Sequence, residues 1–375
     1  MKKILALALT LMLAFAAVSA LADIKADVEA GEQMTTEQLL EKALAETGVF
    51  TAAGNTSRIV KAAAAFQEKY GIQTEASNLK DQEIYNKLDS TVIDMVMIQD
   101  GANLLDYIDL DKLFNFVPAS VRDQIADADR EPALVQQYIN KVFIYNKLGD
   151  DVPAIRNVWE LTAPEMKGRV IFKSPTLEKV NQNFLVMLTS DYWAEELAEA
   201  YKAWKGEDIV LGDYPNAGYK WIAEFLANVT FIKSDTTIAE EVSQDTAAGK
   251  IGLFVLSKLR AGTVITDNLT VAQYDATEKD YVLEPFGGFM YPMYVTVSAK
   301  ANRPYTAMLF IDFLMSEEGF SFWNDSIGAY SPNPNIPHKE GDLDLDVWKN
   351  TLVMEDPLYI QENIEVEDFI RLHCQ

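Results

Sequence analysis

The stretch VFTAAGNTSRIVKAAAAFQEKYGI, residues 49–72, is the part of the sequence from which the fold can be predicted. It opens with β-prone apolar residues, passes through Gly-Asn-Thr-Ser at residues 54–57, and continues with apolar residues at the spacing of one helix face. A strand, a glycine-containing turn and a helix in this order place unpaired helix N–H groups beside the turn. The stretch therefore predicts a ligand loop at the start of a helix.

The segments around this stretch alternate between strand and helix in the same way. Short apolar strands separated by amphipathic helices are typical of a parallel sheet covered on both faces, so the predicted fold class is α/β. We expect strands over residues 48–53, 72–76, 92–98 and 142–146, and helices over residues 35–46 (with Thr36 as N-cap), 56–70 and 81–88.

A second set of α/β elements follows. The segment VWELTAPEMKGRVIFKSP predicts a helix, a proline-interrupted turn and a strand over residues 169–173. Further along we expect helices over residues 180–189, 194–204 and 219–227, and a buried strand over residues 251–256. After Ser331 the chain becomes rich in proline and asparagine and then acidic, which indicates a peripheral C-terminal extension.

The first residues have the pattern of a secretory signal peptide. Lys2 and Lys3 precede an apolar run over residues 4–18, and Ala-Leu-Ala stands immediately before Asp23. The apolar run is too short for a membrane span, and no later segment is apolar for about 18 residues. We therefore expect a signal peptide at residues 1–22 and a soluble, exported mature protein.

Length and charge restrict the class of protein further. Residues 23–375 are long enough for two domains or lobes. The formal net charge is −25, whereas nucleic acids and anionic lipids are bound by clusters of Lys and Arg. The composition argues against both as partners, and an acidic surface is also a common means of keeping an exported protein soluble.

Cysteine and histidine are scarce. Cys374 is the single cysteine, and the two histidines are His338 and His373. An intrachain disulfide, a thiolate metal cluster and a lipid-attachment cysteine are therefore excluded. The sequence contains no G-x-S-x-G, H-E-x-x-H or glycine-rich nucleotide motif, and no cofactor is predicted. With 57 Asp and Glu, a hydrolase that uses paired carboxylates stays open as an alternative.

The best candidate ligand residues are Gly54, Asn55 and Thr56, in the first loop. Glycine permits close backbone approach, Asn and Thr offer short polar groups, and the following helix supplies free N–H donors. The alternative is that Asn55 or Thr56 only caps the helix.

Polar residues at two other strand ends are further candidates, because ligands of α/β sheets bind beyond the carboxyl ends of the strands. Gln99 and Asp100 follow the strand at residues 92–98, and Asp100 could instead be a helix N-cap. Ser174 and Thr176 follow the strand at residues 169–173, and Asn181 lies at the start of the next helix.

Four phrases, in order, resemble the family 1 extracellular solute-binding proteins, which are the receptors of ABC importers for iron, polyamines, thiamine and related solutes. AFQEKYGI is similar to the phrase that ends that family's first helix. FIYNKLGDDVPAIRNVWELTAPEMKGRVIFKSP resembles its crossover, VSQDTAAGKIGLFV a later helix and strand, and AMLFIDFLMSEEGFSFWNDSIGAYSPNPNI its closing segment. The resemblance covers residues 49–336.

The resemblance implies a two-lobe, type II periplasmic-binding fold. Each lobe would be a mostly parallel sheet flanked by helices, with a hinge of crossing strands near residues 142–146 and 281–286. The expected divisions are an N-terminal extension (23–45), lobe 1 (46–145), lobe 2 (146–285), a segment returning to lobe 1 (286–330) and the acidic extension (331–375).

The resemblance also implies a non-catalytic receptor that binds a small polar solute in the cleft between lobes and delivers it to a permease of the inner membrane by hinge closure. A periplasmic monomer is expected; a ligand-sensing partner of a membrane receptor is the third alternative. One departure concerns iron. The iron-binding branch commonly has two adjacent tyrosines, whereas this sequence has no Tyr-Tyr pair, and Tyr214 and Tyr219 are the nearby candidates, so whether a metal is bound stays open.

Overall fold

A computed structural model describes residues 24–147, 155–272 and 283–374. The signal peptide expected at residues 1–22 lies outside the described residues. Among the described residues, no helix is both long and apolar enough to cross a membrane.

The chain forms two compact units. Unit 1 contains the chain up to Gln137 and residues 293–325 and 331–337, and unit 2 contains residues 138–292, 326–330 and 338–375. The first two changes of unit fall within long strands, β5 (Leu134–Asn146) and β10 (Gly288–Ser298), and the other three fall between residues 325 and 338. The crossings were expected at residues 142–146 and 281–286, of which residues 281 and 282 are not described.

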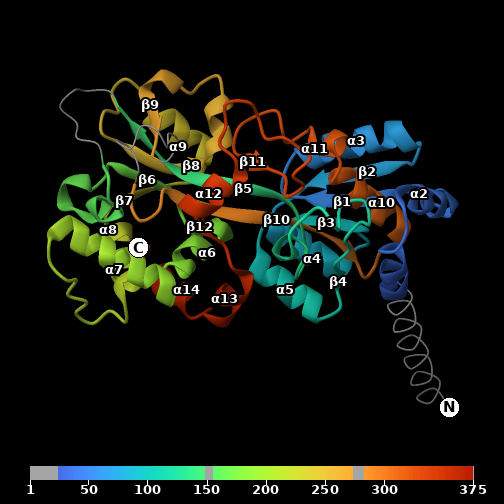
Figure 1. Ribbon diagram of the computed structural model, residues 1–375, viewed down its shortest axis with the longest axis horizontal. Coiled ribbons are helices and arrows are strands. Elements are labelled where there is room, and N and C mark those ends of the chain that lie inside the picture. Colours follow the sequence, from blue (N-terminus) through green and yellow to red (C-terminus); the bar gives the residue numbers. More distant parts are fainter. Residues whose placement is uncertain (1–23, 148–154, 273–282, 375) are drawn as a thin grey trace, which may run out of the picture. The chain divides into compact units, whose positions relative to one another are not determined.

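Unit 1 is built on three parallel strands. Its strand order is β2-β1-β3-β10, and β10 runs antiparallel to β3 and also pairs with β4. Because β1 lies between β2 and β3, the right-handed crossover rule places α3 and α4 on opposite faces of these strands, as Figure 1 shows. The bounds are β1 Phe50–Gly54, β2 Thr74–Asn78, β3 Met95–Ile98 and β4 Leu113–Phe114, with helices α2 Thr36–Ala45, α3 Arg58–Tyr70, α4 Asp81–Ser90, α5 Gly101–Asp109, α10 Pro304–Leu314 and α11 Glu317–Phe320.

The α3 helix follows from its sequence. Its apolar residues Ile59, Ala62, Ala63 and Phe66 recur at helical spacing and are buried, and Gly71 ends the helix in the left-handed region at φ 69°. The Phe66 ring lies 5.0 Å from the Phe310 ring of α10 and 6.1 Å from the Phe50 ring of β1, measured between centroids. Burial of each such phenyl ring contributes about 1.5–3 kcal/mol, so these contacts fix α3 on the sheet.

Unit 2 also has a parallel centre. β6 runs parallel to β7 on one side and to β8 on the other. β5 runs antiparallel to β8, β9 and β11, and β12 pairs with β10. The strand bounds are β6 Val170–Lys173, β7 Val229–Ile232, β8 Ile251–Val255, β9 Leu269–Val271, β11 Ala329–Tyr330 and β12 Val353–Met354.

Helices cover the strands of unit 2, and α9 packs on β8 and β6. Buried tryptophans tie the other helices together: Trp159 donates its indole N–H to the Leu197 carbonyl at 2.7 Å, and Trp221 donates to the Val158 carbonyl at 3.0 Å. The helix bounds are α6 Lys179–Met187, α7 Asp191–Lys205, α8 Ala217–Asn228, α9 Asp235–Val242, α12 Leu345–Thr351, α13 Pro357–Glu362 and α14 Val366–His373.

The segment expected to be a peripheral extension is instead an integral part of unit 2 from residue 338 on. Helix α14 packs on α6 and α8, and α13 packs on α6. The side chains of Trp348, Ile360 and Ile370 are buried. Its acidic residues concealed this packing, because they alternate with the apolar residues that form the buried face.

Two local expectations were wrong. Thr35, not Thr36, caps α2: the Thr35 hydroxyl accepts from the Gln38 N–H, and the Gln38 side chain accepts from the Thr35 N–H. The helix expected in VWELTAPEM consists of two short 3₁₀ helices, Val158–Thr162 and Pro164–Met166, because Pro164 cannot continue the first one.

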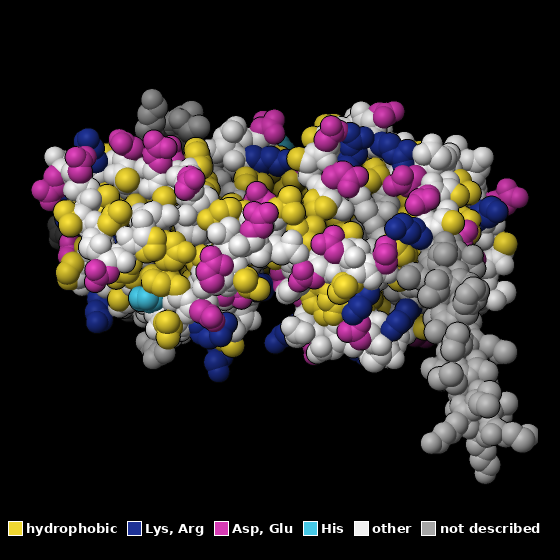
Figure 2. Space-filling view, turned by 90° about the horizontal axis from the view of Figure 1, so that it is seen from below, with side chains coloured by type: hydrophobic (Ala, Val, Ile, Leu, Met, Phe, Trp, Pro, Cys, Tyr) yellow, Lys and Arg dark blue, Asp and Glu magenta, His cyan; other side chains and the backbone are white. Residues whose placement is uncertain are grey.

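Charge is spread over the surface. Figure 2 shows that acidic side chains are distributed over the face in view, with Lys and Arg between them, and do not gather in one patch. On this face the acidic side chains therefore do not point to one binding region.

Candidate functional site

The first two predicted ligand loops lie at the same edge of unit 1. β1 and β3 are adjacent and parallel, and Gly54 pairs with Met97, so the chain leaves both strands on one side. A Cβ atom on Gly54 would lie 3.1 Å from the Cβ atom of Met97, and glycine therefore suits the close approach of the strands here. The structure thus brings the Asn55–Thr56 loop next to the Gln99–Asp100 loop.

The start of α3 is only partly capped. Ser57 is at the N-cap position with helical backbone angles and makes no side-chain cap hydrogen bond. Thr56 takes a part of that role, because its hydroxyl accepts from the Arg58 N–H at 3.3 Å. Asn55 and Thr56 are half-buried, and the N-terminus of α3 gives their loop a partial positive charge.

The Gln99–Asp100 loop is held by other acidic and aromatic side chains. Asp100 is the N-cap of α5, and its carboxylate accepts from the backbone and side-chain N–H groups of Asn103 at 3.4 and 2.5 Å. The backbone N–H groups of Gln99 and Asp100 donate to Asp81 at 3.3 and 3.1 Å. The Tyr85 hydroxyl donates to the Asp100 carbonyl at 3.1 Å, and burial, followed by the charges of Asp100 and Asp81, raises the pKa of Tyr85. Asp100 is thus buried as a cap, whereas Gln99 is half-buried.

In unit 2 the corresponding edge is formed by the ends of β6, β7 and β8. Ser174 directly follows β6, and its hydroxyl shares a 2.8 Å hydrogen bond with the Thr176 hydroxyl. The Ser174 N–H donates to the Ile232 carbonyl at the end of β7. Ser174 is half-buried and Thr176 is exposed, so both hydroxyls can reach a solute at this edge.

Four charged side chains meet beneath this loop in an alternating arrangement. The Lys141 ammonium, on β5, contacts Glu178, and lies 3.2 Å from Asp235 Oδ1. The Lys173 ammonium lies 2.6 Å from Glu178 Oε1 and 3.3 Å from Asp235 Oδ2. We call Lys141, Lys173, Glu178 and Asp235 the charge cluster; it joins the middle of β5 and the end of β6 to the starts of α6 and α9.

The charge cluster is electrically neutral, with Lys141 and Asp235 buried and Lys173 and Glu178 half-buried. The Lys141 side chain has no exposed surface, and that of Asp235 is 7% exposed. Burial by itself favours a lower pKa for Lys141, but Asp235 and Glu178 outweigh it and the pKa is raised. Burial by itself favours a higher pKa for Asp235, but Lys141 and Lys173 outweigh it and the pKa is lowered. Both groups are therefore charged at neutral pH.

Asn181 is part of the same arrangement. Its side-chain N–H group donates to the Lys173 carbonyl at 2.8 Å, and its carbonyl oxygen accepts from Lys141 at 2.8 Å. The residue is fully buried. These contacts give Asn181 a role in holding the charge cluster below the Ser174–Thr176 loop.

Sequence reasoning missed three members of the charge cluster: Lys141, Lys173 and Glu178. The fourth member, Asp235, is the first residue of α9, which Ser234 caps. One signal was available, since Lys141 interrupts the otherwise uncharged β-prone run LVQQYINKVFIYN. A lysine in a buried strand requires a carboxylate partner, but the sequence does not reveal which one.

The two candidate tyrosines are engaged elsewhere. Tyr214 and Tyr219 both pack on Phe369 of α14, with ring centroids 6.4 and 4.9 Å apart. Burial, followed by the charge of Glu365, raises the pKa of Tyr219, which makes phenolate formation harder. In the described part of the chain, no group of three or more His, Cys, Asp or Glu is placed to hold a metal ion.

Sequence comparisons leave the family of the chain undetermined. No protein-family model matches the sequence, and no curated protein gives a significant match.

Comparison of structures shows which fold this is. A ferric binding protein from Campylobacter jejuni is similar with a TM-score of 0.66 at 15% identity, over 87% of this chain and 99% of that one. Iron-bound HitA from Pseudomonas aeruginosa has a TM-score of 0.63 at 15% identity, over 88% and 100%. The periplasmic binding protein AfuA from Actinobacillus pleuropneumoniae, with fructose-6-phosphate bound, has a TM-score of 0.62 at 17% identity, over 87% and 100%.

The fold is therefore that of the two-lobe periplasmic binding proteins, as the sequence predicted. These neighbours are binding proteins and not enzymes. HitA is iron-bound and AfuA has a phosphorylated sugar bound, so the shared fold does not identify the solute.

Proposed function

We propose that this protein is the extracytoplasmic solute-binding receptor of an ABC importer. The observation that carries the proposal is the fold, which matches periplasmic binding proteins along 87–88% of the chain. Polar loops at the carboxyl ends of parallel strands support it, because this is where α/β sheets bind ligands. The receptor is non-catalytic, and its partners are a small polar solute and a permease.

The proposed contacts with the solute are residues of the predicted ligand loops. In unit 1 they are Gly54, through its backbone, and the polar side chains of Asn55, Thr56 and Gln99, while Asp100 mainly shapes the loop through its cap. In unit 2 they are Ser174 and Thr176, with Asn181 acting through the charge cluster. This assignment favours a solute recognised by hydrogen bonds, because the charge cluster is neutral and the carboxylate of Asp100 already accepts two hydrogen bonds.

The proposed location is the periplasm. Residues 1–22 would direct export and be removed, and the mature protein would act as a monomer. N-terminal sequencing of the protein secreted by its native host tests this, with a new N-terminus near Asp23 as the expected result.

A thermal-denaturation panel tests the receptor proposal. Mature protein is heated with ferric citrate, putrescine, spermidine, thiamine, a phosphonate, fructose-6-phosphate and neutral sugars. A solute at 100-fold excess over its Kd stabilises the folded state by about 2.7 kcal/mol. We expect one chemical class to raise the melting temperature, and a paired Thr56→Ala, Ser174→Ala variant to lose that shift. A flat response to every compound would contradict the proposal.

The same panel separates a receptor from a hydrolase with paired carboxylates. The stabilising solute is recovered after prolonged incubation and analysed by mass spectrometry. A receptor returns the solute unchanged, whereas conversion of the solute would assign the protein to the enzyme alternative.

A further inference from the structure

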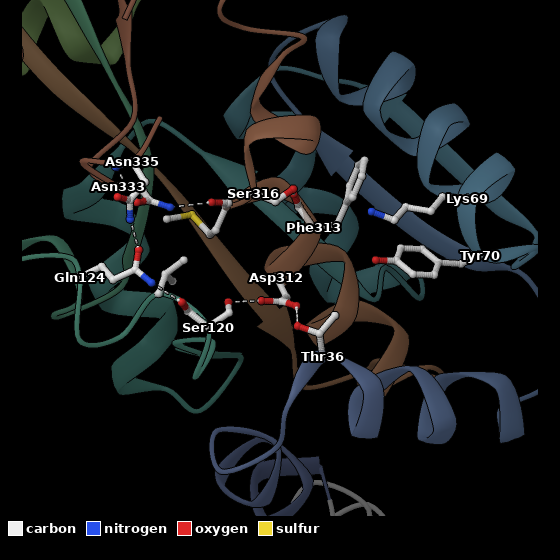
Figure 3. Close-up of a pocket in the computed structure, with 12 residues that line it drawn as sticks. Thr36, Lys69, Tyr70, Ser120, Gln124, Asp312, Phe313, Ser316, Asn333 and Asn335 are labelled. Carbon is white, nitrogen blue, oxygen red and sulfur yellow. Dashed lines mark hydrogen bonds between the residues drawn. The ribbon is translucent and has the colours of Figure 1, made fainter. Parts of the chain in front are cut away.

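A cavity lies wholly within unit 1, away from the predicted ligand loops. Its volume is about 280 Å³, which suits a molecule smaller than a drug. It is lined at the last turns of α3 and α10, at the start of α2 and by loop residues around Ser120 and Asn333 (Figure 3). Because the ligand loop precedes α3 and this cavity lies at the end of α3, the 13 residues of that helix separate them by about 18 Å.

Asp312 is a buried carboxylate at the centre of this cavity. Its Oδ2 atom accepts from the Thr36 hydroxyl at 2.6 Å, and its Oδ1 atom accepts from the Ser120 hydroxyl. Asp312 is 6% exposed, and no Lys or Arg among the described residues forms an ion pair with it. Burying a carboxylate without a positive partner is costly, and two neutral hydroxyls do not balance its charge.

Helix dipoles add to the negative potential. Asp312 and Phe313 belong to the last turn of α10, and Lys69 and Tyr70 to the last turn of α3. Each helix C-terminus carries about half a negative charge. The N-terminus of α2 at Thr36 contributes the opposite sign, so the cavity as a whole remains negative.

Aromatic rings form another part of the wall. The rings of Tyr70 and Phe313 meet edge to face, with centroids 6.4 Å apart. The Lys69 ammonium lies 5.3 Å from the Tyr70 centroid and 5.5 Å from the Phe313 centroid, which shows that a cation fits against both rings. Lys69 itself pairs with Glu318 at 2.5 Å, so its charge is already neutralised.

Hydrogen-bond acceptors complete the cavity. Figure 3 shows the side chains of Gln124, Asn333 and Asn335 on the side of the cavity opposite Lys69 and Tyr70. The side-chain oxygens of Gln124 and Asn333 each accept one hydrogen bond from Asn335, and an amide oxygen or a carboxylate can accept more than one. Negative charge and hydrogen-bond acceptors together recognise an ammonium group, and the aromatic rings offer an apolar surface to the alkyl chain that carries it.

We propose that this cavity is a second ligand site, specific for a small primary ammonium compound, with Asp312 as its counter-ion. The alkyl part of the ligand would lie against Tyr70 and Phe313, and the ammonium group would displace no ion pair. The inference does not depend on the proposed receptor function, because it rests on unit 1 alone.

Ligand-observed NMR with n-butylammonium chloride tests the proposal on the full mature chain. We expect saturation transfer to butylammonium and little to n-butanol at the same concentration. Asp312→Asn should weaken butylammonium binding at least about tenfold. Asp111→Asn is the matched control, because it removes the same charge from an exposed position in the same unit, and should leave binding unchanged.

Two further variants protect the test against misfolding and misassignment. Gln124→Trp blocks the cavity at an exposed position and should abolish binding without disturbing the core. Asn55→Ala alters the other predicted site and should leave butylammonium binding intact. The proposal would be overturned if n-butanol bound as well as butylammonium, or if Asp312→Asn and Gln124→Trp bound butylammonium as tightly as the wild type. It would also be overturned if Asn55→Ala alone lost butylammonium binding, and that result would support the receptor function.

Discussion

Replacing Lys141 by Met should destabilise the protein strongly. The Lys141 side chain is fully buried, contacts Glu178, and lies 3.2 Å from Asp235 and 2.8 Å from the Asn181 oxygen. Methionine fills a similar volume, but it leaves the charge cluster with two carboxylates and one lysine. Loss of one partner from a buried ion pair costs about 3–5 kcal/mol, and the partial exposure of Glu178, 16%, places the expected loss near the lower end.

The matched control for Lys141→Met is Lys69→Met. In the Lys69–Glu318 pair the ammonium nitrogen and the carboxylate oxygen lie 2.5 Å apart, in direct contact as in the Lys141–Glu178 pair, but the two side chains are 40% and 55% exposed. An exposed pair contributes about 0–1 kcal/mol, so this variant should unfold close to the wild type. The two variants remove the same side chain and therefore differ mainly in burial.

The assay is urea unfolding followed by tryptophan fluorescence. Five of the six tryptophans, all except Trp323, belong to unit 2, so the signal reports on the unit that holds the charge cluster. A second change, Glu178→Gln, should recover part of the loss in Lys141→Met, because it restores neutrality, with a coupling energy of about 1–3 kcal/mol. Equal midpoints for Lys141→Met and Lys69→Met, or no recovery in the double variant, would refute this account of the cluster.

Three other predictions concern unit 2. Burial alone would raise the pKa of Asp235, but Lys141 and Lys173 outweigh burial, and the pKa is lowered from its usual 3.8. The contribution of the Asp235 carboxylate to the stability of the folded state is therefore full above pH 3.8 and is lost as the pH falls through the lower folded pKa. The stability difference between wild type and Asp235→Asn should be constant near neutral pH and shrink in acid, and a difference that grows in acid would reverse the sign. Gly288→Ala should lower the free energy of unfolding, measured by thermal unfolding, by about 3 kcal/mol or more, because φ is 144° and the new Cβ would lie 2.1 Å from a β5 carbonyl oxygen. The control Gly341→Ala, at φ 87° with open space around the new Cβ, should lower it by about 1–2 kcal/mol. Equal losses of stability in the two variants would contradict the predicted clash. Trp348→Ala should lower the free energy of unfolding by about 3–5 kcal/mol and Leu372→Ala should leave it almost unchanged, because the first side chain is buried and the second is 67% exposed. Unchanged stability in Trp348→Ala would mean that residues 331–375 are a peripheral extension after all.

Much of the fold could be predicted because it depends on local patterns. The strand, turn and helix of residues 49–72 are found within two residues of their expected bounds, since their apolar residues have the spacing that burial on one face requires. Cap positions were harder to predict. Thr35 and Thr36 are both good N-caps, and only the reciprocal contact with Gln38 decides between them.

Features that depend on distant contacts could not be predicted. The role of Lys141 requires Glu178 and Asp235 to meet it, and these come from the starts of two different helices. Asp312 likewise is a candidate counter-ion only because it is buried in contact with two neutral hydroxyls, those of Thr36 and Ser120, which are distant in the sequence. Sequence periodicity records which side chains are buried, but it carries no information about which charges they meet.

Isothermal titration calorimetry of the mature protein, with the solute that stabilises it most in the thermal panel, tests whether the protein is a solute-binding receptor. The wild type is compared with the Thr56→Ala, Ser174→Ala variant, and the solute is analysed chemically afterwards. A receptor should bind one solute molecule per chain, lose affinity at least about tenfold in the variant and return the solute intact. Saturation at an equal affinity in the variant, or conversion of the solute during the titration, would contradict the claim.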